Sequence, residues 1–216
     1  NAQNGFGGVQ RVADVIAAAN ADIVGLQECS AATTNQILLL LRQMPGYASA
    51  QASGAAGVVS RYPITATYTS GGLYGYGVKV TLPSHEEVRF FNSHLTAYPY
   101  GPYTIRDGLG VAQALSDELA TRHAEMSAVM NQLVDNPFNQ PYLATYLVGD
   151  HNTPSHLDWT AANAAQNFGI TFLWPVSVLI ENRGFRDLFR DVHSDPVVTR
   201  GLTWSPGYPK NTLASN

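Results

Sequence analysis

The chain has little cysteine, little lysine and no long apolar run. Its single cysteine, Cys29, excludes an internal disulfide. With only two lysines, Lys79 and Lys210, and a formal net charge of -4, it has no broad basic face, which disfavours non-specific binding along duplex nucleic acid. The run "QILLLL" is far too short to span a bilayer, and the sequence predicts no transmembrane segment.

The apolar content is nevertheless sufficient for a folded domain. Hydrophobic residues make up 45% and charged residues 13% of the 216 positions, which is far from the composition of a disordered chain. No repeat, low-complexity tract or linker interrupts the sequence, so we expect one domain over residues 1–216. Scarce lysine beside many Asn, Gln, Thr and Tyr residues favours a secreted protein.

Hydrophobic periodicity predicts helices alternating with short strands. Helical signals occur at 9–19, 34–44, 111–134 and 184–192, and from 158 onward. Short β-type runs occur at 22–28, 47–51, 55–60, 64–70, 76–82, 88–95, 142–149 and 201–205. The consecutive strands between 47 and 95 favour antiparallel pairing. This order of elements predicts an α/β fold with two packed sheets and helices outside them.

Three of the predicted strands end in polar side chains. The first ends at Gln27-Glu28, the second at Asn92-Ser93-His94, and the third at Asp150-His151-Asn152. Active sites of layered α/β folds collect at strand ends, where a rigid scaffold presents side chains to solvent. A carboxylate suits a hard cation, a histidine can move a proton, and an asparagine amide can donate to a developing oxyanion. The set predicts metal-assisted hydrolysis.

Structural explanations of the same residues stay open. Asp and Asn favour Asx turns, a strand-end Glu is often only solvated, and a His is often a satisfied core residue. A further alternative is a separate transition-metal site at His151, His156 and Asp158, spaced as H-x4-H-x-D. A helix cap at Asp158 or at the Ser before His156 is the simpler interpretation. We expect Cys29 in the core, because alternation turns it away from Glu28.

The strand-end motifs also carry a resemblance. In this order, "GLQE", "FFNSHL" and "LVGDHN" resemble the motifs of the endonuclease/exonuclease/phosphatase superfamily, which includes DNase I-like nucleases and phosphatases. The segments "SRYPI" (60–64) and "GLTWSP" (201–206) resemble further parts of that family. The resemblance implies a DNase I-like fold, a four-layer α/β sandwich of two central mixed β-sheets flanked by helices.

The resemblance implies a role for each strand-end residue. Glu28 would bind a divalent cation, usually Mg²⁺, with Mn²⁺ or Ca²⁺ as alternatives, and Asn1 would line the same metal site. Asp150 and Asn152 would orient the attacking water and bind the phosphoryl group. His94 would contact the scissile phosphate and stabilise the transition state.

The segment after "SHL" would bring two more residues to the phosphate, Tyr103 and Arg106. Other family segments do not occur: the strand that precedes the first metal ligand is missing before Asn1, and no "SDH" motif is present. We therefore expect a chain that is incomplete at both ends.

The predicted function is that of a metal-dependent phosphoesterase, which hydrolyses a phosphodiester or a phosphomonoester by attack of water. The acidic pI of about 5.8 favours a small molecule or a lipid headgroup as substrate, with nucleic acid as the alternative. Two other functions remain open, a DNase I-like nuclease and a non-catalytic binding module that retains the fold.

Overall fold

A computed structural model describes residues 8–42, 47, 49–53, 56–69 and 74–203, with only the backbone described for 49–53. The chain divides into two units. Unit 1 comprises residues 1–95 and 125–151, and unit 2 comprises residues 96–124 and 152–216. The single domain expected over residues 1–216 stays a prediction.

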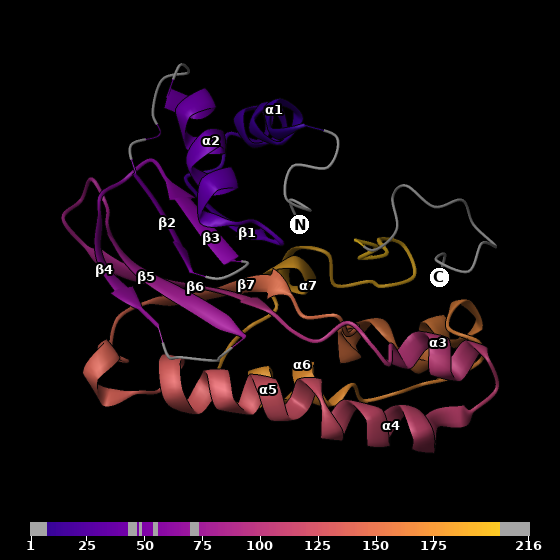
Figure 1. The fold of residues 1–216 in the computed structure, drawn as a ribbon. Helices are drawn as coiled ribbons and strands as arrows, with labels where there is room; N and C mark the ends of the chain where they lie inside the picture. Colours follow the sequence, from indigo (N-terminus) through magenta and orange to yellow (C-terminus); the bar gives the residue numbers. More distant parts are fainter. Residues whose placement is uncertain (1–7, 43–46, 48, 54–55, 70–73, 204–216) are drawn as a thin grey trace. The chain divides into compact units, whose positions relative to one another are not determined.

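The smaller sheet of unit 1 has the strand order β1-β3-β2. Its strands are β1 (Ile23–Gln27), β2 (Ser49–Ser53) and β3 (Ala56–Ser60), and both pairs are antiparallel. The helices α1 (Val9–Ala19) and α2 (Ala31–Arg42) lie together on one side of this sheet (Figure 1). The helices predicted at 9–19 and 34–44 are thus confirmed over their described residues.

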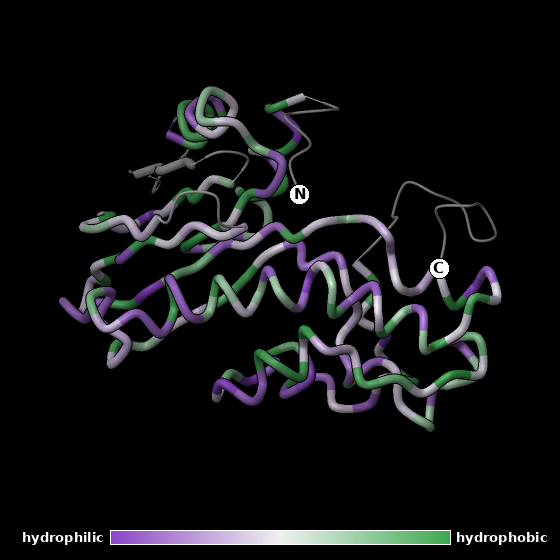
Figure 2. Tube along the Cα trace, turned by 60° about the horizontal axis from the view of Figure 1, so that its bottom comes forward, coloured by the Kyte–Doolittle hydropathy of each residue, from purple (hydrophilic) through white to green (hydrophobic). Residues whose placement is uncertain are grey.

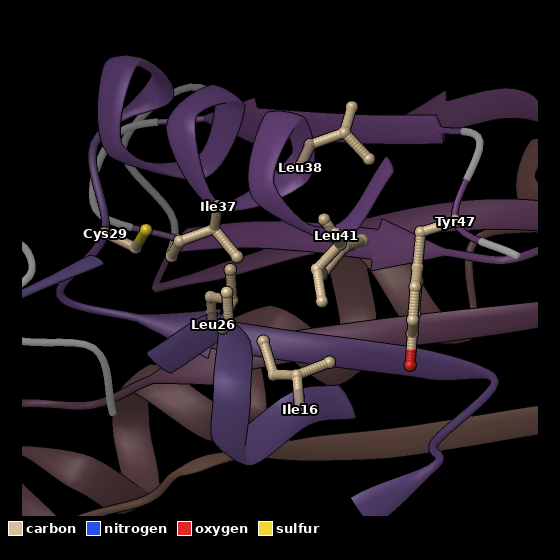
Figure 3. Packing of buried hydrophobic residues seen from close by; sticks show 9 residues of the cluster. Ile16, Leu26, Cys29, Ile37, Leu38, Leu41 and Tyr47 are labelled. Carbon is tan, nitrogen blue, oxygen red and sulfur yellow. The ribbon is translucent and has the colours of Figure 1, made fainter. Parts of the chain in front are cut away.

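An apolar cluster explains why these helices dock on the sheet. Buried side chains of α1 and α2 meet Leu26 of β1, and Figure 3 shows Ile37 and Leu41 of α2 beside it. Cys29, just beyond β1, belongs to the same cluster and is fully buried, as expected. Burial raises the pKa of the Cys29 thiol, so this thiol stays protonated near neutral pH.

The larger sheet of unit 1 has the order β4-β5-β6-β7. The strands β4 (Ile64–Tyr68), β5 (Gly75–Thr81) and β6 (Glu87–His94) pair antiparallel, and β7 (Thr145–Asp150) runs parallel to β6. The antiparallel pairing expected between residues 47 and 95 is confirmed.

The two sheets pack closely against each other. A Cβ built at Gly25 of β1 would lie 2.7 Å from Val148 of β7 and 2.9 Å from Asn92 of β6, so glycine is needed where the sheets approach. The end of α5 (Arg122–Val129) and the π-helical turn η2 (Met130–Val134) pack near β5. Helices therefore flank both sheets, and the predicted α/β sandwich is confirmed.

Unit 2 is mainly helical. Its core contains Trp159, Phe172 and Trp174. The rings of Trp159 and Phe172 pack edge to face against Trp174, with centroid distances of 5.0 and 4.6 Å. Its elements are α3 (Gly101–Arg106), α4 (Gly110–Ala120), η4 (His156–Asp158), η5 (Ala161–Gln166), α6 (Pro175–Asn182) and α7 (Leu188–Val192).

Several predicted elements are wrong in detail. The helix expected over 111–134 is interrupted at Thr121, whose φ of -121° and ψ of -98° are not helical. The helix expected from Asp158 is replaced by the short 3₁₀ turns η4 and η5. Residues 201–203 form no strand, and the rest of that expected strand lies outside the described residues.

Hydrophobic and hydrophilic residues alternate along the helical segments (Figure 2). Within the described ranges, no helix combines the length and the apolarity that crossing a membrane requires.

Candidate active site

The C-terminal ends of β6 and β7 place two candidate residues side by side. His94 ends β6, Asp150 ends β7, and the two are partners in the parallel register. The Leu95 N–H donates to the Asp150 carbonyl at 3.0 Å and so extends the pairing by one residue. A Cβ at Gly149 would collide with the Ser93 carbonyl, which explains the glycine directly before Asp150.

Glu28 comes to this edge from the other sheet. It follows β1 directly and adopts a φ of 51°, a left-handed backbone conformation that is unfavourable for residues other than glycine. Its Oε1 lies 3.9 Å from His94 Nε2, beyond hydrogen-bond distance. The Glu28 and His94 side chains are 40% and 24% exposed, so both can be reached from solvent.

Two amides hold the strands behind these residues. The Gln27 Nε2 donates to Asn92 Oδ1 at 2.6 Å, and the Asn92 Nδ2 donates to the carbonyls of Leu26 and Gly57 at 2.9 and 3.0 Å. Asn92 is fully buried, so its three hydrogen bonds join β6 to both β1 and β3 in a low-dielectric environment. The distance between Glu28 and His94 therefore rests on a satisfied polar network.

His151 follows Asp150 and is kept neutral. Burial lowers the pKa of the His151 ring to about 4, although the charge of Asp150 opposes this shift. Its Nε2 is buried and has no hydrogen-bond partner among the described residues.

The other predicted site residues belong to unit 2 or lie outside the description. Asn152 begins the second segment of unit 2 with a φ of 50°, a conformation that asparagine tolerates. Tyr103 and Arg106 both lie on α3, where the Arg106 guanidinium stacks 4.1 Å from the Tyr103 ring centre. Arg106 Nε also donates to Asp107 at 2.8 Å. Asn1 lies outside the described residues.

The alternative metal site at His151, His156 and Asp158 has no support. His156 Nδ1 lies 3.0 Å from Ser177 Oγ, His156 Nε2 lies 3.0 Å from Glu181, and Asp158 pairs with Arg190. Moreover, no three His, Cys, Asp or Glu side chains of the described chain form a cluster suited to a metal ion.

Some polar residues received no role from the sequence. Gln27 and Asn92 stand at the polar strand ends together with Glu28 and His94, but only their burial shows that they join the strands, since a buried amide needs partners. Glu118 and Arg122 fall four and eight residues after the buried Ala114, on the apolar stripe of a helical pattern, and both are fully buried. Charged residues at the apolar positions of a helical pattern likewise indicate a buried ion pair.

The sequence profile of the endonuclease/exonuclease/phosphatase family matches residues 1–214, and the chain belongs to this family. Its members are hydrolases that act on phosphate esters. The resemblance of the strand-end motifs is therefore confirmed.

Individual relatives share about a third of their residues with this chain or fewer. An uncharacterized protein of Caenorhabditis elegans is 30% identical over 207 residues, which are 92% of this chain. The chain spans 65% of that relative's length.

Solved structures share less of the sequence. A truncated TDP2 from Caenorhabditis elegans is 16% identical, with a TM-score of 0.46 over 68% of this chain and 55% of that one. A mannosyl-6-phosphatase from Bacteroides thetaiotaomicron is 16% identical, with a TM-score of 0.46 over 67% and 56% of the two chains. A D. rerio TDP2, solved with a single-strand DNA product, is 17% identical, with a TM-score of 0.44 over 75% and 58%.

Proposed function

We propose that this protein is a metal-dependent phosphoesterase that hydrolyses a phosphodiester or a phosphomonoester by attack of water. The observation that carries the proposal is the convergence of Glu28, His94 and Asp150 at one edge of unit 1, where two parallel strand ends meet the end of a third strand. Membership of a family of phosphate-ester hydrolases supports it.

The proposed cation is Mg²⁺, with Mn²⁺ or Ca²⁺ as alternatives. Mg²⁺ keeps several waters and binds through one or two carboxylates together with substrate phosphate. Glu28, whose carboxylate is 40% exposed, would supply the carboxylate. Asn1 is the second proposed ligand. When bound, the cation would neutralise charge on the phosphoryl oxygens.

The remaining chemistry belongs to the side chains. Asp150 orients a water molecule and takes part in removing its proton. His94 donates a hydrogen bond from its ring to a phosphoryl oxygen, and Asn152 donates one from its amide as negative charge builds. Tyr103 and Arg106 bind the phosphate of the substrate.

The net charge of -4 favours a small molecule or a lipid headgroup over bulk nucleic acid as substrate. A secreted location also stays a prediction. The alternative is a nuclease of the same family, and an experiment must distinguish it from a phosphoesterase that acts on small molecules.

The test is hydrolysis of bis-p-nitrophenyl phosphate and of p-nitrophenyl phosphate by the full-length protein, with Mg²⁺ and with EDTA. We expect turnover that EDTA removes, and the better substrate distinguishes a diesterase from a monoesterase. Glu28→Gln should raise the Mg²⁺ concentration needed for half-maximal rate. Turnover that persists in EDTA would contradict the metal dependence, and DNA cleavage that weakens steeply with salt would favour the nuclease.

A further inference from the structure

Unit 2 contains an ion pair that is entirely shielded from solvent. Arg122 Nε donates to Glu118 Oε1 at 2.7 Å, and both side chains are 0% exposed. Removing two charges from water is costly unless hydrogen bonds satisfy them. A pair at this depth therefore needs an explanation from the groups that it contacts.

The rest of the guanidinium binds one short loop. Arg122 Nη1 donates to the Thr96 carbonyl at 2.9 Å and to the Ala97 carbonyl at 3.4 Å, and Nη2 donates to the Pro99 carbonyl at 2.6 Å. Together with Glu118 these carbonyls make four acceptors, which match the donors of an arginine fork and exceed the three N–H donors of a lysine. This loop begins two residues after His94 and leads into α3, which carries Tyr103 and Arg106.

Glu118 is stabilised in its charged form by Arg122. Burial raises the pKa of Glu118, and the charge of Arg122 and its hydrogen bond oppose the rise. Gly101 packs against the pair as well, because a Cβ at this position would collide with the Trp174 ring and would lie 3.4 Å from Glu118 Oε1.

We propose that the Glu118–Arg122 pair is a positioning pair for the hydrolysis proposed above: it holds the loop 96–99 and so fixes the segment that follows His94 and leads to Tyr103 and Arg106. The inference rests on the proposed function. Neither side chain touches the reacting atoms, so Arg122 acts through the backbone that it holds and Glu118 acts through Arg122.

A matched control lies in the same unit. Arg190 is also buried, donates from Nη1 to the carbonyls of His193 and Thr199 at 2.8 Å each, and pairs with Asp158 through Nη2. It makes the same kinds of bond as Arg122, but it holds residues 193–199, which contain no proposed site residue. Loss of stability is thus common to both arginines, whereas an effect on catalysis is expected for Arg122 only.

The experiment compares Arg122→Lys, Glu118→Gln and Arg190→Lys in the full-length protein, with bis-p-nitrophenyl phosphate and Mg²⁺. We expect Arg122→Lys to lower kcat on the order of 10- to 100-fold with little change in KM, because a misplacement of about 1 Å costs that much in rate. Glu118→Gln should lower kcat less and gives a second test if Arg122→Lys does not fold. Arg190→Lys should lower Tm but leave kcat per folded molecule unchanged.

Amide hydrogen exchange supplies a readout that does not depend on turnover. Exchange in residues 96–101 should quicken in Arg122→Lys and not in Arg190→Lys. Wild-type kcat in folded Arg122→Lys and Glu118→Gln, or equal losses in Arg122→Lys and Arg190→Lys, would overturn the positioning role while leaving the proposed function intact. Absence of metal-dependent turnover in the wild-type protein would instead overturn the proposed function, and the positioning role with it.

Discussion

Strands β6 and β7 carry polar side chains at both ends, but they use them differently. At their N-terminal ends, Arg89 donates to the Val134 carbonyl at 2.6 Å, to the Asn139 carbonyl at 3.2 Å and to Thr145 Oγ1 at 2.6 Å. At their C-terminal ends, His94 stands 3.9 Å from Glu28, and both side chains remain partly exposed.

The difference separates structural polar residues from candidate catalytic ones. Arg89 is 2% exposed and is committed to the loop that leads into β7, which includes the 3₁₀ turn η3 (Pro137–Asn139). At the C-terminal ends, His94 and Glu28 keep solvent access, and Glu28, which follows β1, has a strained φ of 51°; both features are frequent at functional sites. Substitutions at the C-terminal ends should therefore affect catalysis, and substitutions at the N-terminal ends should affect stability alone.

The largest expected effect is on catalysis at the C-terminal end. Asp150→Asn should lower kcat roughly 10²–10³-fold, equivalent to about 3–4 kcal/mol of transition-state stabilisation. The control is Glu87→Gln, which removes a carboxylate from the opposite end of the sheet and should leave kcat unchanged. The measurement is Mg²⁺-dependent hydrolysis of bis-p-nitrophenyl phosphate, and near-normal turnover in Asp150→Asn would remove Asp150 from the mechanism.

The next effect is a pH dependence of stability at the same end. The pKa of His151 is lowered from 6.5 to about 4 by burial. Below pH 6.5 the unfolded ring gains a proton that the folded ring does not take up until about pH 4. The free energy of unfolding should therefore fall across this window, by up to about 3 kcal/mol at 1.36 kcal/mol per pKa unit.

His151→Phe should remove that part of the pH dependence, because phenylalanine does not titrate. The measurement is urea unfolding of both proteins at pH 4, 5, 6 and 7. Titrating carboxylates contribute equally to the stability profiles of the two proteins. The difference between the profiles therefore gives the contribution of the His151 ring. If the two stability profiles run parallel, His151 is not held neutral in the folded protein.

The C-terminal ends of β6 and β7 show in the sequence as apolar runs that stop at polar residues, and His94 and Asp150 do lie at the ends of these strands. The parallel register that makes them neighbours was not visible, because periodicity gives the face of a strand and not its partner. Glu28 illustrates the same limit: its distance from His94 depends on the hydrogen bonds of Asn92, which form only when two sheets pack.

Unit 2 was predicted less well because tertiary contacts override its local signals. The helical pattern 111–134 gave no warning of the break at Thr121, yet there Arg122 turns its side chain to the carbonyls of residues 96–99. The helices α3 and α6 do carry a local signal, since Pro102 and Pro175 stand in their first turns, where proline is favoured.

A smaller effect is expected from breaking the structural end. Arg89→Met should lower the free energy of unfolding by about 2 kcal/mol, because it leaves buried carbonyls without a donor. The kcat of the folded protein should not change. Denaturant unfolding and turnover measured on the same sample check both statements. A rate loss comparable to that of Asp150→Asn would mean that the two ends of the sheet are functionally coupled.

The smallest effect is expected at the partly exposed ion pair of the same end. Lys79 Nζ lies 2.9 Å from Glu87 Oε1, with the two side chains 15% and 36% exposed. Glu87→Gln should cost less than about 1 kcal/mol of unfolding free energy, and the cost should shrink in 1 M salt, where screening acts over about 3 Å. Because this carboxylate is the control for Asp150, a slower turnover in Glu87→Gln would show that loss of any carboxylate from this sheet reduces the rate, and the distinction between the two ends would not hold.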